Sequence, residues 1–276
     1  MVTAVIKRGG TVEIQSRLSV LLWGKPKAGK TTFAATAPGE KLWINCDEDG
    51  FDSVRHREDC HLLDVSGFTN DQFFNQMENS NPLGLSKILN DHPKIETVVV
   101  DSATAIFERS LEQAIDIDKA GLSRNFSPSL AVPGISAYGA RTAHLGAILR
   151  SLLRVTRAKN RHLIITAHED TPLLNDNGSV RAIKIMLSDK AINNTSAKFS
   201  EIWYLQEKDD GRYLTIRPVR KRSPMGTRMF EAKSDSRREF KLSYDATLPD
   251  KGQKHLIANW FHEWVQGGGK KLPVPK

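Results

Sequence analysis

The octapeptide at residues 24–31, GKPKAGKT, constrains this chain more than any other segment. It matches the pattern G-x-x-x-x-G-K-[ST] at every defined position. A short apolar run, LSVLLW at residues 18–23, precedes it, and TTFAATA forms the expected start of a helix. A loop placed between a buried strand and a helix in this way wraps phosphates with its backbone N–H groups. The segment therefore predicts a phosphate-binding loop, and an accidental glycine-rich turn is the much weaker alternative.

This loop predicts a P-loop nucleotide site that holds ATP together with Mg²⁺. Gly24 and Gly29 relieve the steric limits of the tight turn. Lys30 is expected to reach the β- and γ-phosphates and to act in catalysis, and the Thr31 hydroxyl is expected to bind Mg²⁺. The expected nucleotide-binding residues are Gly24, Lys25, Pro26, Lys27, Ala28, Gly29, Lys30, Thr31 and Thr32.

Short apolar runs alternate with helical stretches in the middle of the chain. Runs at residues 41–46 (KLWINC), 97–100 (TVVV) and 162–166 (HLIIT) are expected strands. Two helical stretches, at about residues 103–117 and 137–158, separate the last two runs. This alternation predicts an α/β fold with a mostly parallel central sheet flanked by helices. Ligands of such sheets bind at the carboxyl ends of the strands.

The later part of the chain carries antiparallel signals. NDNG lies between two extended runs at residues 173–185, and a second expected strand pair occupies residues 201–205 and 213–219. Both patterns predict late β-hairpins. We expect residues 1–232 to form an ATPase core, and residues 233–276 to form a C-terminal extension with a short amphipathic helix (HLIANWFHEWV) and a flexible tail.

Polar residues at the expected strand ends are candidates for the chemistry of hydrolysis. Asp101 follows TVVV, where a carboxylate beside the phosphate loop would hold Mg²⁺; the alternative is an N-cap of the next helix. Glu48, between Asp47 and Asp49, is expected to orient the attacking water, and the alternative is a solvated acidic turn. His168 ends the fourth run and either contacts the γ-phosphate or is an ordinary hydrogen-bonded loop histidine.

Basic residues outnumber acidic ones by 40 to 32, which gives a net charge of +8. The excess is concentrated late in the chain, where the segment 212–241 holds ten basic and three acidic residues. Such a balance favours a polyanionic partner. The candidates for arginine fingers that reach a neighbour's nucleotide, or for phosphate contacts with DNA, are Arg217, Arg220, Lys221, Arg222 and Arg228. Some of them are alternatively solvated surface charges.

A second group of arginines recurs at helical spacing. Arg150, Arg154, Arg157 and Arg161 share one helical face, opposite apolar positions. A solvated face of an amphipathic helix explains this pattern better than DNA contact does.

Composition excludes two classes of protein. The only two cysteines, Cys46 and Cys60, make neither a disulfide framework nor a zinc site of four such ligands. No apolar stretch approaches the roughly 18 residues of a membrane span, so we expect no membrane partner. A cytoplasmic location is expected.

The order of these motifs resembles the RecA-like ATPases. TVVVDSATAI at residues 97–106 is similar to the Walker B region of RecA. LLWGKPKAGKTTFAATAP, GFDS at residues 50–53, SAYGA and LIITAHE look like the compact phage-encoded RecA-like ATPases, some of which assist single-strand annealing in recombination. The resemblance covers about residues 15–230.

The resemblance implies roles for several residues. Glu48 matches the catalytic glutamate if GFDS anchors the alignment, whereas Asp47 takes that place if the strand does. His168 falls where RecA has a glutamine that links the nucleotide to a mobile DNA-binding loop, here residues 169–199. The implied partners are single-stranded DNA, further copies of the chain in a ring or filament with ATP at subunit interfaces, and a single-strand binding protein.

We therefore expect an ATPase that acts on single-stranded DNA in phage-type recombination, annealing or replication. Two alternatives remain. One is a helicase-like or loader ATPase, and the other is a DNA-binding scaffold that uses ATP only to assemble.

Overall fold

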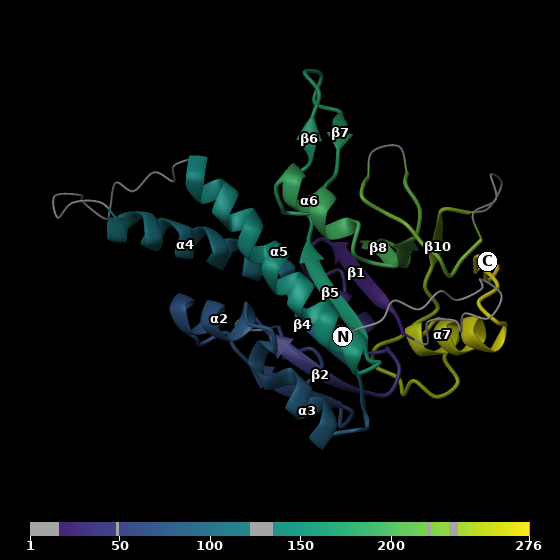
Figure 1. Cartoon of the computed structure of the whole chain (residues 1–276). Coiled ribbons are helices and arrows are strands. Elements are labelled where there is room, and N and C mark those ends of the chain that lie inside the picture. Colours follow the sequence, from purple (N-terminus) through teal and green to yellow (C-terminus); the bar gives the residue numbers. More distant parts are fainter. Residues whose placement is uncertain (1–16, 48–49, 122–134, 220–221, 232–236, 276) are drawn as a thin grey trace, which may run out of the picture.

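The computed structural model describes residues 17–47, 50–121, 135–219, 222–231 and 237–275. A mostly parallel sheet lies at the centre, with helices on both faces and a hairpin that projects from one end (Figure 1). The α/β fold expected from the sequence is confirmed. No helix in these described segments is both long and apolar enough to cross a membrane.

The central sheet has the strand order β10-β9-β8-β1-β5-β4-β2-β3. The six strands from β8 to β3 in this order are parallel, whereas β9 and β10 are antiparallel to their neighbours. The strands are β1 (Ser19–Gly24), β2 (Glu40–Asn45), β3 (Cys60–Asp64), β4 (Ile95–Asp101), β5 (His162–His168), β8 (Glu201–Lys208), β9 (Gly211–Thr215) and β10 (Glu239–Lys241).

The register of the central strands brings their polar ends together. β1 pairs with β5 so that Gly24 lies opposite His168, and β2 pairs with β4 so that Asn45 lies opposite Asp101. β1 and β5 are almost completely buried, because helices cover the sheet on both faces. The start of the phosphate loop, a histidine and an aspartate therefore meet at one edge of the sheet.

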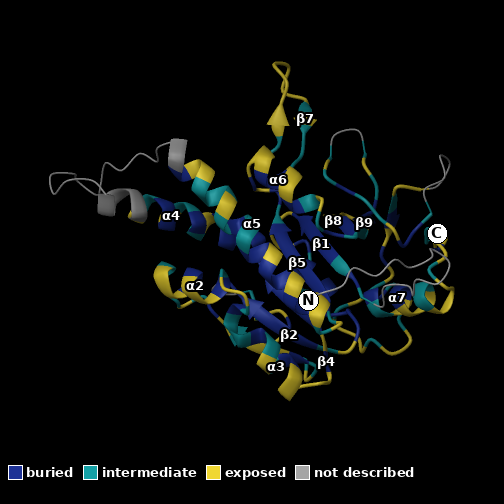
Figure 2. Cartoon of the chain, in the orientation of Figure 1, coloured by how far each residue is buried: buried dark blue, intermediate teal, exposed yellow. Residues whose placement is uncertain are grey.

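Two helical layers cover the sheet. α1 (Lys30–Ala34) and α7 (Ile257–Gln266) pack on one face. There the rings of Phe33 and Trp260 contact each other edge to face, with 6.0 Å between the ring centroids. The other face carries α2 (Asn70–Met77), the short 3₁₀ turn η2 (Pro82–Gly84), α3 (Leu85–Asp91), α4 (Ala103–Gly121), α5 (Ile135–Ala158) and α6 (Asp189–Ser196). Their inner sides are buried and their outer sides exposed (Figure 2).

The elements absent from the sequence expectations include β3, α2 and α3. β3 is an edge strand with a single buried residue, Cys60, and Leu62 is 48% exposed. It therefore lacks the continuous apolar run that marks a strand buried on both faces. The other two helices are only eight and seven residues long.

Both late hairpins are confirmed. β6 (Leu173–Leu174) pairs with β7 (Val180–Ala182) in a separate small sheet. This is the hairpin that projects beyond α6 in Figure 1. β8 and β9 form the second hairpin, although β9 ends at Thr215 rather than at residue 219.

The expected C-terminal extension contributes to the same sheet and core. β10 pairs with β9, and α7 buries Ile257, Trp260 and Phe261. Within the expected tail, the backbone N–H of Leu272 donates to the carbonyl oxygen of Met229, and the Leu272 carbonyl oxygen accepts from the backbone N–H of Glu231, both at 2.8 Å. These two bonds pair the end of the chain with a segment about forty residues earlier.

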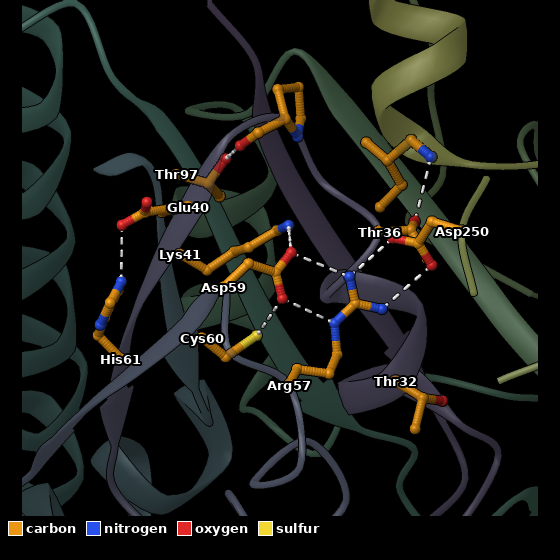
Figure 3. A network of polar contacts seen from close by, with 12 residues as sticks. Thr32, Thr36, Glu40, Lys41, Arg57, Asp59, Cys60, His61, Thr97 and Asp250 are labelled. Carbon is orange, nitrogen blue, oxygen red and sulfur yellow. Dashed lines mark hydrogen bonds and ion pairs between the residues drawn. The ribbon is translucent and has the colours of Figure 1, made fainter. Parts of the chain in front are cut away.

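A polar network also fastens this extension to the start of the sheet (Figure 3). The Arg57 guanidinium contacts Asp59 at 3.0 Å and Asp250 at 2.7 Å, and Lys41 contacts Asp59 at 2.6 Å. Close by, the backbone N–H of Ile257 donates to the Thr36 hydroxyl at 3.1 Å. Arg57 thus joins the sheet to a residue almost two hundred positions later in the chain.

Candidate nucleotide-binding site

The backbone of the phosphate loop requires glycine at two positions. Gly24, which ends β1, has φ +156°, and an added Cβ there would lie 2.0 Å from the carbonyl oxygen of Leu205. Gly29 has φ +88° and caps α1 in the left-handed conformation. Side chains are excluded at Gly24 by lack of space and disfavoured at Gly29 by backbone strain. The motif glycines therefore let the loop run from β1 to α1 while it passes close to β8.

Lys30 lies buried over its own loop. Its Nζ donates to the carbonyl oxygens of Lys25 at 2.8 Å and Gly24 at 3.1 Å. It also lies 3.3 Å from Nδ1 of His168. Burial lowers the pKa of Lys30 to about 8, although the nearby carboxylates, Asp101 first among them, act in the opposite direction. An anion placed at this loop would stabilise the charged ammonium.

Thr31 and Asp101 form the expected Mg²⁺-binding pair. The Thr31 hydroxyl donates to Oδ2 of Asp101 at 2.8 Å, and the Thr166 hydroxyl donates to Oδ1. Burial raises the pKa of Asp101, and the two hydroxyl donors act against this rise. The alternative role as an N-cap is wrong, because the Ser102 hydroxyl accepts from the backbone N–H of Ala105 and so caps α4. A hydroxyl and a carboxylate in contact suit Mg²⁺, which prefers oxygen ligands.

His168 lies at the end of β5 with its ring against Lys30. Its backbone N–H donates to the Thr104 hydroxyl at 2.9 Å, which fixes the strand end. Burial, and then the charge of Lys30, lowers the pKa of His168. The ring is therefore neutral at pH 7 and accepts a hydrogen bond from the ammonium.

The carboxylates after β2 are only partly described. Glu48 and Asp49 lie outside the described residues, so the catalytic role of Glu48 stays a prediction. Asp47 is described, and its charge raises the pKa of both Lys30 and Asp101. It therefore lies close to the phosphate loop and to the Mg²⁺ pair. The choice between Asp47 and Glu48 as the residue that orients water stays open.

Comparison with protein families identifies this arrangement. The profile of the AAA domain matches residues 16–234, which is more than half of the chain. The chain belongs to the AAA domain family. A comparison with curated proteins found no match. The family implies ATP binding and hydrolysis, in agreement with the P-loop.

A Mg²⁺ ion that is bound together with a nucleotide needs few ligands from the protein. No group of three or more His, Cys, Asp and Glu side chains that could hold a metal lies within the part of the chain that the structure describes. Mg²⁺ in nucleotide sites takes one or two protein oxygens and completes its shell with phosphate and water. Thr31 and Asp101 would supply those protein oxygens.

Three of the late basic candidates, Arg217, Arg222 and Arg228, are described, and each has different contacts. Arg220 and Lys221 lie outside the described residues. The Arg222 guanidinium donates to Gln206 at 2.9 Å and to Glu239 at 3.2 Å, and it lies over the ring of Tyr204. Arg228 is exposed at the other edge of the sheet, where its backbone N–H donates to Glu201.

Arg217 is the remaining described member of that group. Its guanidinium donates to the carbonyl oxygen of Arg237 at 3.3 Å. A role for Arg217, Arg222 or Arg228 at a neighbour's nucleotide stays a prediction, and for Arg222 it requires the contact with Glu239 to break.

Two residues of the site were missed by sequence reasoning, Glu169 and Arg212. Arg212, in β9, lies against the phosphate loop, since an added Cβ at Gly29 would be 2.8 Å from its guanidinium carbon. Glu169 follows His168 and accepts from the Tyr204 hydroxyl at 2.7 Å, while its other oxygen is buried with no hydrogen-bond partner among the described residues. No spacing pattern marks either residue, because only strand pairing brings them to the loop.

Proposed function

We propose that this AAA domain hydrolyses ATP in response to single-stranded DNA, in phage-type recombination, annealing or replication within the host cytoplasm. The observation that carries the proposal is the cluster of Lys30, Thr31, Asp101 and His168 at neighbouring strand ends. This cluster joins the phosphate site to the segment that follows β5, which is the segment that responds to nucleotide in the RecA-like proteins that the sequence resembles.

The chemistry follows from the contacts of the loop. On binding ATP, the Lys30 ammonium exchanges the carbonyl oxygens of Gly24 and Lys25 for phosphate oxygens. This exchange is favourable because the phosphates relieve the cost of burying the ammonium. Mg²⁺, held by Thr31 and Asp101, would neutralise developing charge on the phosphates. A carboxylate after β2, Asp47 or Glu48, orients the attacking water.

A chain of contacts leads away from the phosphate site. His168 touches Lys30, and the next residue, Glu169, is bonded to Tyr204, over which Arg222 lies. The same backbone continues from Glu169 into the projecting hairpin β6–β7. Loss of the γ-phosphate would alter the contacts of Lys30 and His168. Because His168 directly precedes Glu169, such a change would be passed to the contacts of Glu169 and to the hairpin that follows it.

ATP at the interface between copies of the chain is the second part of the proposal. The candidate fingers Arg217, Arg220, Arg222 and Arg228, with Lys221, lie in one segment after β9. A ring or filament would place such a cation at a neighbour's phosphates, where it stabilises the charge of the transition state. A single-strand binding protein is the further partner of this assembly.

The deciding experiment measures ATP turnover by the purified full chain alone, with single-stranded DNA and with a forked duplex. The Lys30→Ala variant serves as the inactive control. Stimulation by single-stranded DNA, lost in Lys30→Ala, supports the proposal. Stimulation by the fork alone favours a helicase-like or loading ATPase. DNA binding without any turnover favours a scaffold that uses ATP only to assemble, and equal turnover with and without DNA contradicts the proposal.

A further inference from the structure

A groove lies at the edge of the sheet opposite the phosphate loop. It has a volume of about 720 Å³ and lies between the last turns of α5 and the starts of β1 and β8. β1 is six residues long, so at about 3.3 Å per residue the groove is roughly 17 Å from Gly24. It is therefore separate from the ATP site.

Cations from three distant segments line this groove. They come from the exposed face of α5 (Figure 2), from the turn between α6 and β8, and from the segment before residue 230. These side chains, which we call the basic groove, are Arg150, Arg154, Arg157, Lys198 and Arg228. The sequence alone favours a solvated face for the three arginines of α5, and the structure places two further cations across from them.

The cations of the basic groove form no ion pairs with other described residues. No carboxylate in the described segments forms an ion pair with any of its five cations. Arg154 and Lys198 instead donate to backbone carbonyl oxygens, those of Ser80 and Asn194. Burial, and then the charge of Arg150, lowers the pKa of Lys198, which shows that like charges lie close together.

Glu201 lies at the same edge of the sheet, but its carboxylate accepts hydrogen bonds from uncharged groups. It is 1% exposed and accepts from the Thr227 hydroxyl and from the backbone N–H groups of Arg228 and Met229. Burial raises the pKa of Glu201 to about 7, so near neutral pH it carries only part of a negative charge. It therefore supports the wall of the groove without cancelling its charge.

Hydrogen bonds connect the two strands that form the floor of the groove. Ser19 and Ser200 bind each other through backbone and hydroxyl groups at 2.9–3.2 Å, which joins the starts of β1 and β8. On α5, Arg150, Arg154 and Arg157 share one face and span about 10 Å at 1.5 Å per residue. A row of cations of this length on a rigid helix suits a row of anions better than a single anion.

We infer that the basic groove binds the phosphodiester backbone of a nucleic-acid strand, at the edge of the sheet away from ATP. This inference rests on the proposed action on DNA and adds a contact surface to it. Phe199, the aromatic residue of the lining, is buried, so bases have no ring to stack on here. The groove then contacts phosphates, and its affinity does not depend on the base sequence of the nucleic acid. An acidic protein segment is the competing ligand class.

The test uses the full chain and a fluorescent oligonucleotide of about 30 nucleotides, followed by anisotropy across a range of salt. In the triple variant Arg150→Gln, Arg154→Gln and Arg157→Gln, we expect binding to weaken about tenfold or more. The slope of log affinity against log salt should fall by about two, at roughly 0.7 per lost single-strand contact. Lys198→Gln, on the other wall, should lower the slope by somewhat less than one. Turnover without DNA should be unchanged in both, because these residues lie far from the phosphate loop.

A matched control removes three positive charges elsewhere, through Arg55→Gln, Lys87→Gln and Lys251→Gln. These positions are exposed, and glutamine preserves helix propensity at Lys87 and in α5. Circular dichroism and thermal melting confirm that each variant is folded. If wild type binds DNA and the groove variant matches this control, the groove assignment is overturned while the DNA-dependent function stands.

Two further outcomes separate the ligand classes. If wild type binds no nucleic acid, the proposed action on DNA fails, and the groove assignment fails with it. If polyglutamate of equal charge displaces the oligonucleotide from wild type as well as unlabelled DNA does, the groove is an acidic-peptide site and the nucleic-acid assignment is overturned. Single-stranded and duplex competitors then show which form of the backbone binds more tightly.

Discussion

The burial of Lys30 predicts that ATP affinity falls between pH 7 and pH 9. Its pKa of about 8 in the free site means that most copies are charged at pH 7, whereas about one in ten is charged at pH 9. Bound phosphates require the ammonium, so its pKa in the complex is higher and binding takes up a proton. The dissociation constant of MgATP should therefore rise about tenfold from pH 7 to pH 9, or about 1.4 kcal/mol.

The assay follows a fluorescent ATP analogue by titration with Mg²⁺ present, at half-unit steps of pH. His168 does not confound it, because burial and Lys30 lower the pKa of that ring and it stays neutral above pH 7. The γ-phosphate is also fully ionised in the upper part of this range, since the second pKa of such groups is about 6. In Lys30→Ala, affinity should be weaker and nearly independent of pH.

A lysine with an ordinary pKa of 10.5 would give almost no change over the same interval. A dissociation constant that changes less than twofold between pH 7 and pH 9 in wild type would therefore refute the argument from burial. An equal slope in Lys30→Ala would assign the titration to another group.

Three further predictions concern single positions. Glu48→Gln should bind ATP normally and hydrolyse it at least about a hundredfold more slowly in single turnover. If only Asp47→Asn shows this loss, Asp47 is the residue that orients the attacking water. Gly24→Ala should abolish nucleotide binding or soluble expression, because its Cβ meets the Leu205 carbonyl oxygen at 2.0 Å; wild-type affinity would contradict the loop geometry. Arg57→Ala should lower the free energy of unfolding by about 1–3 kcal/mol at pH 7 in urea denaturation. Asp59 beside Arg57 has a lowered pKa, so this loss should fade as pH falls below about 4, where the unfolded carboxylate takes up a proton; a loss unchanged at pH 3 would exclude the ion pairs as its cause.

Local sequence determined the nucleotide site. The P-loop needs only eight consecutive residues between a strand and a helix, and its conformation is set by glycine backbone freedom at positions 24 and 29. The placement of Asp101 and His168 at this edge of the sheet was also predictable, because each ends an apolar run and parallel strands align their carboxyl ends. Edge strand β3 was not, since a strand exposed on one side lacks the apolar run that reveals a buried one.

Tertiary structure alone decided which distant residues share a surface. Arg212 reaches Gly29 because β9 pairs with β8 and β8 with β1, and Leu272 is held by Met229 through backbone bonds that any sequence can make. The sequence pattern of the α5 arginines favours a solvated helix face. Only the structure shows that Lys198 lies across a groove from them. Hydrophobic periodicity shows which side of a helix or strand is polar. The residues that face it across a groove are set by pairing between segments far apart in the chain, and no local sequence pattern specifies that pairing.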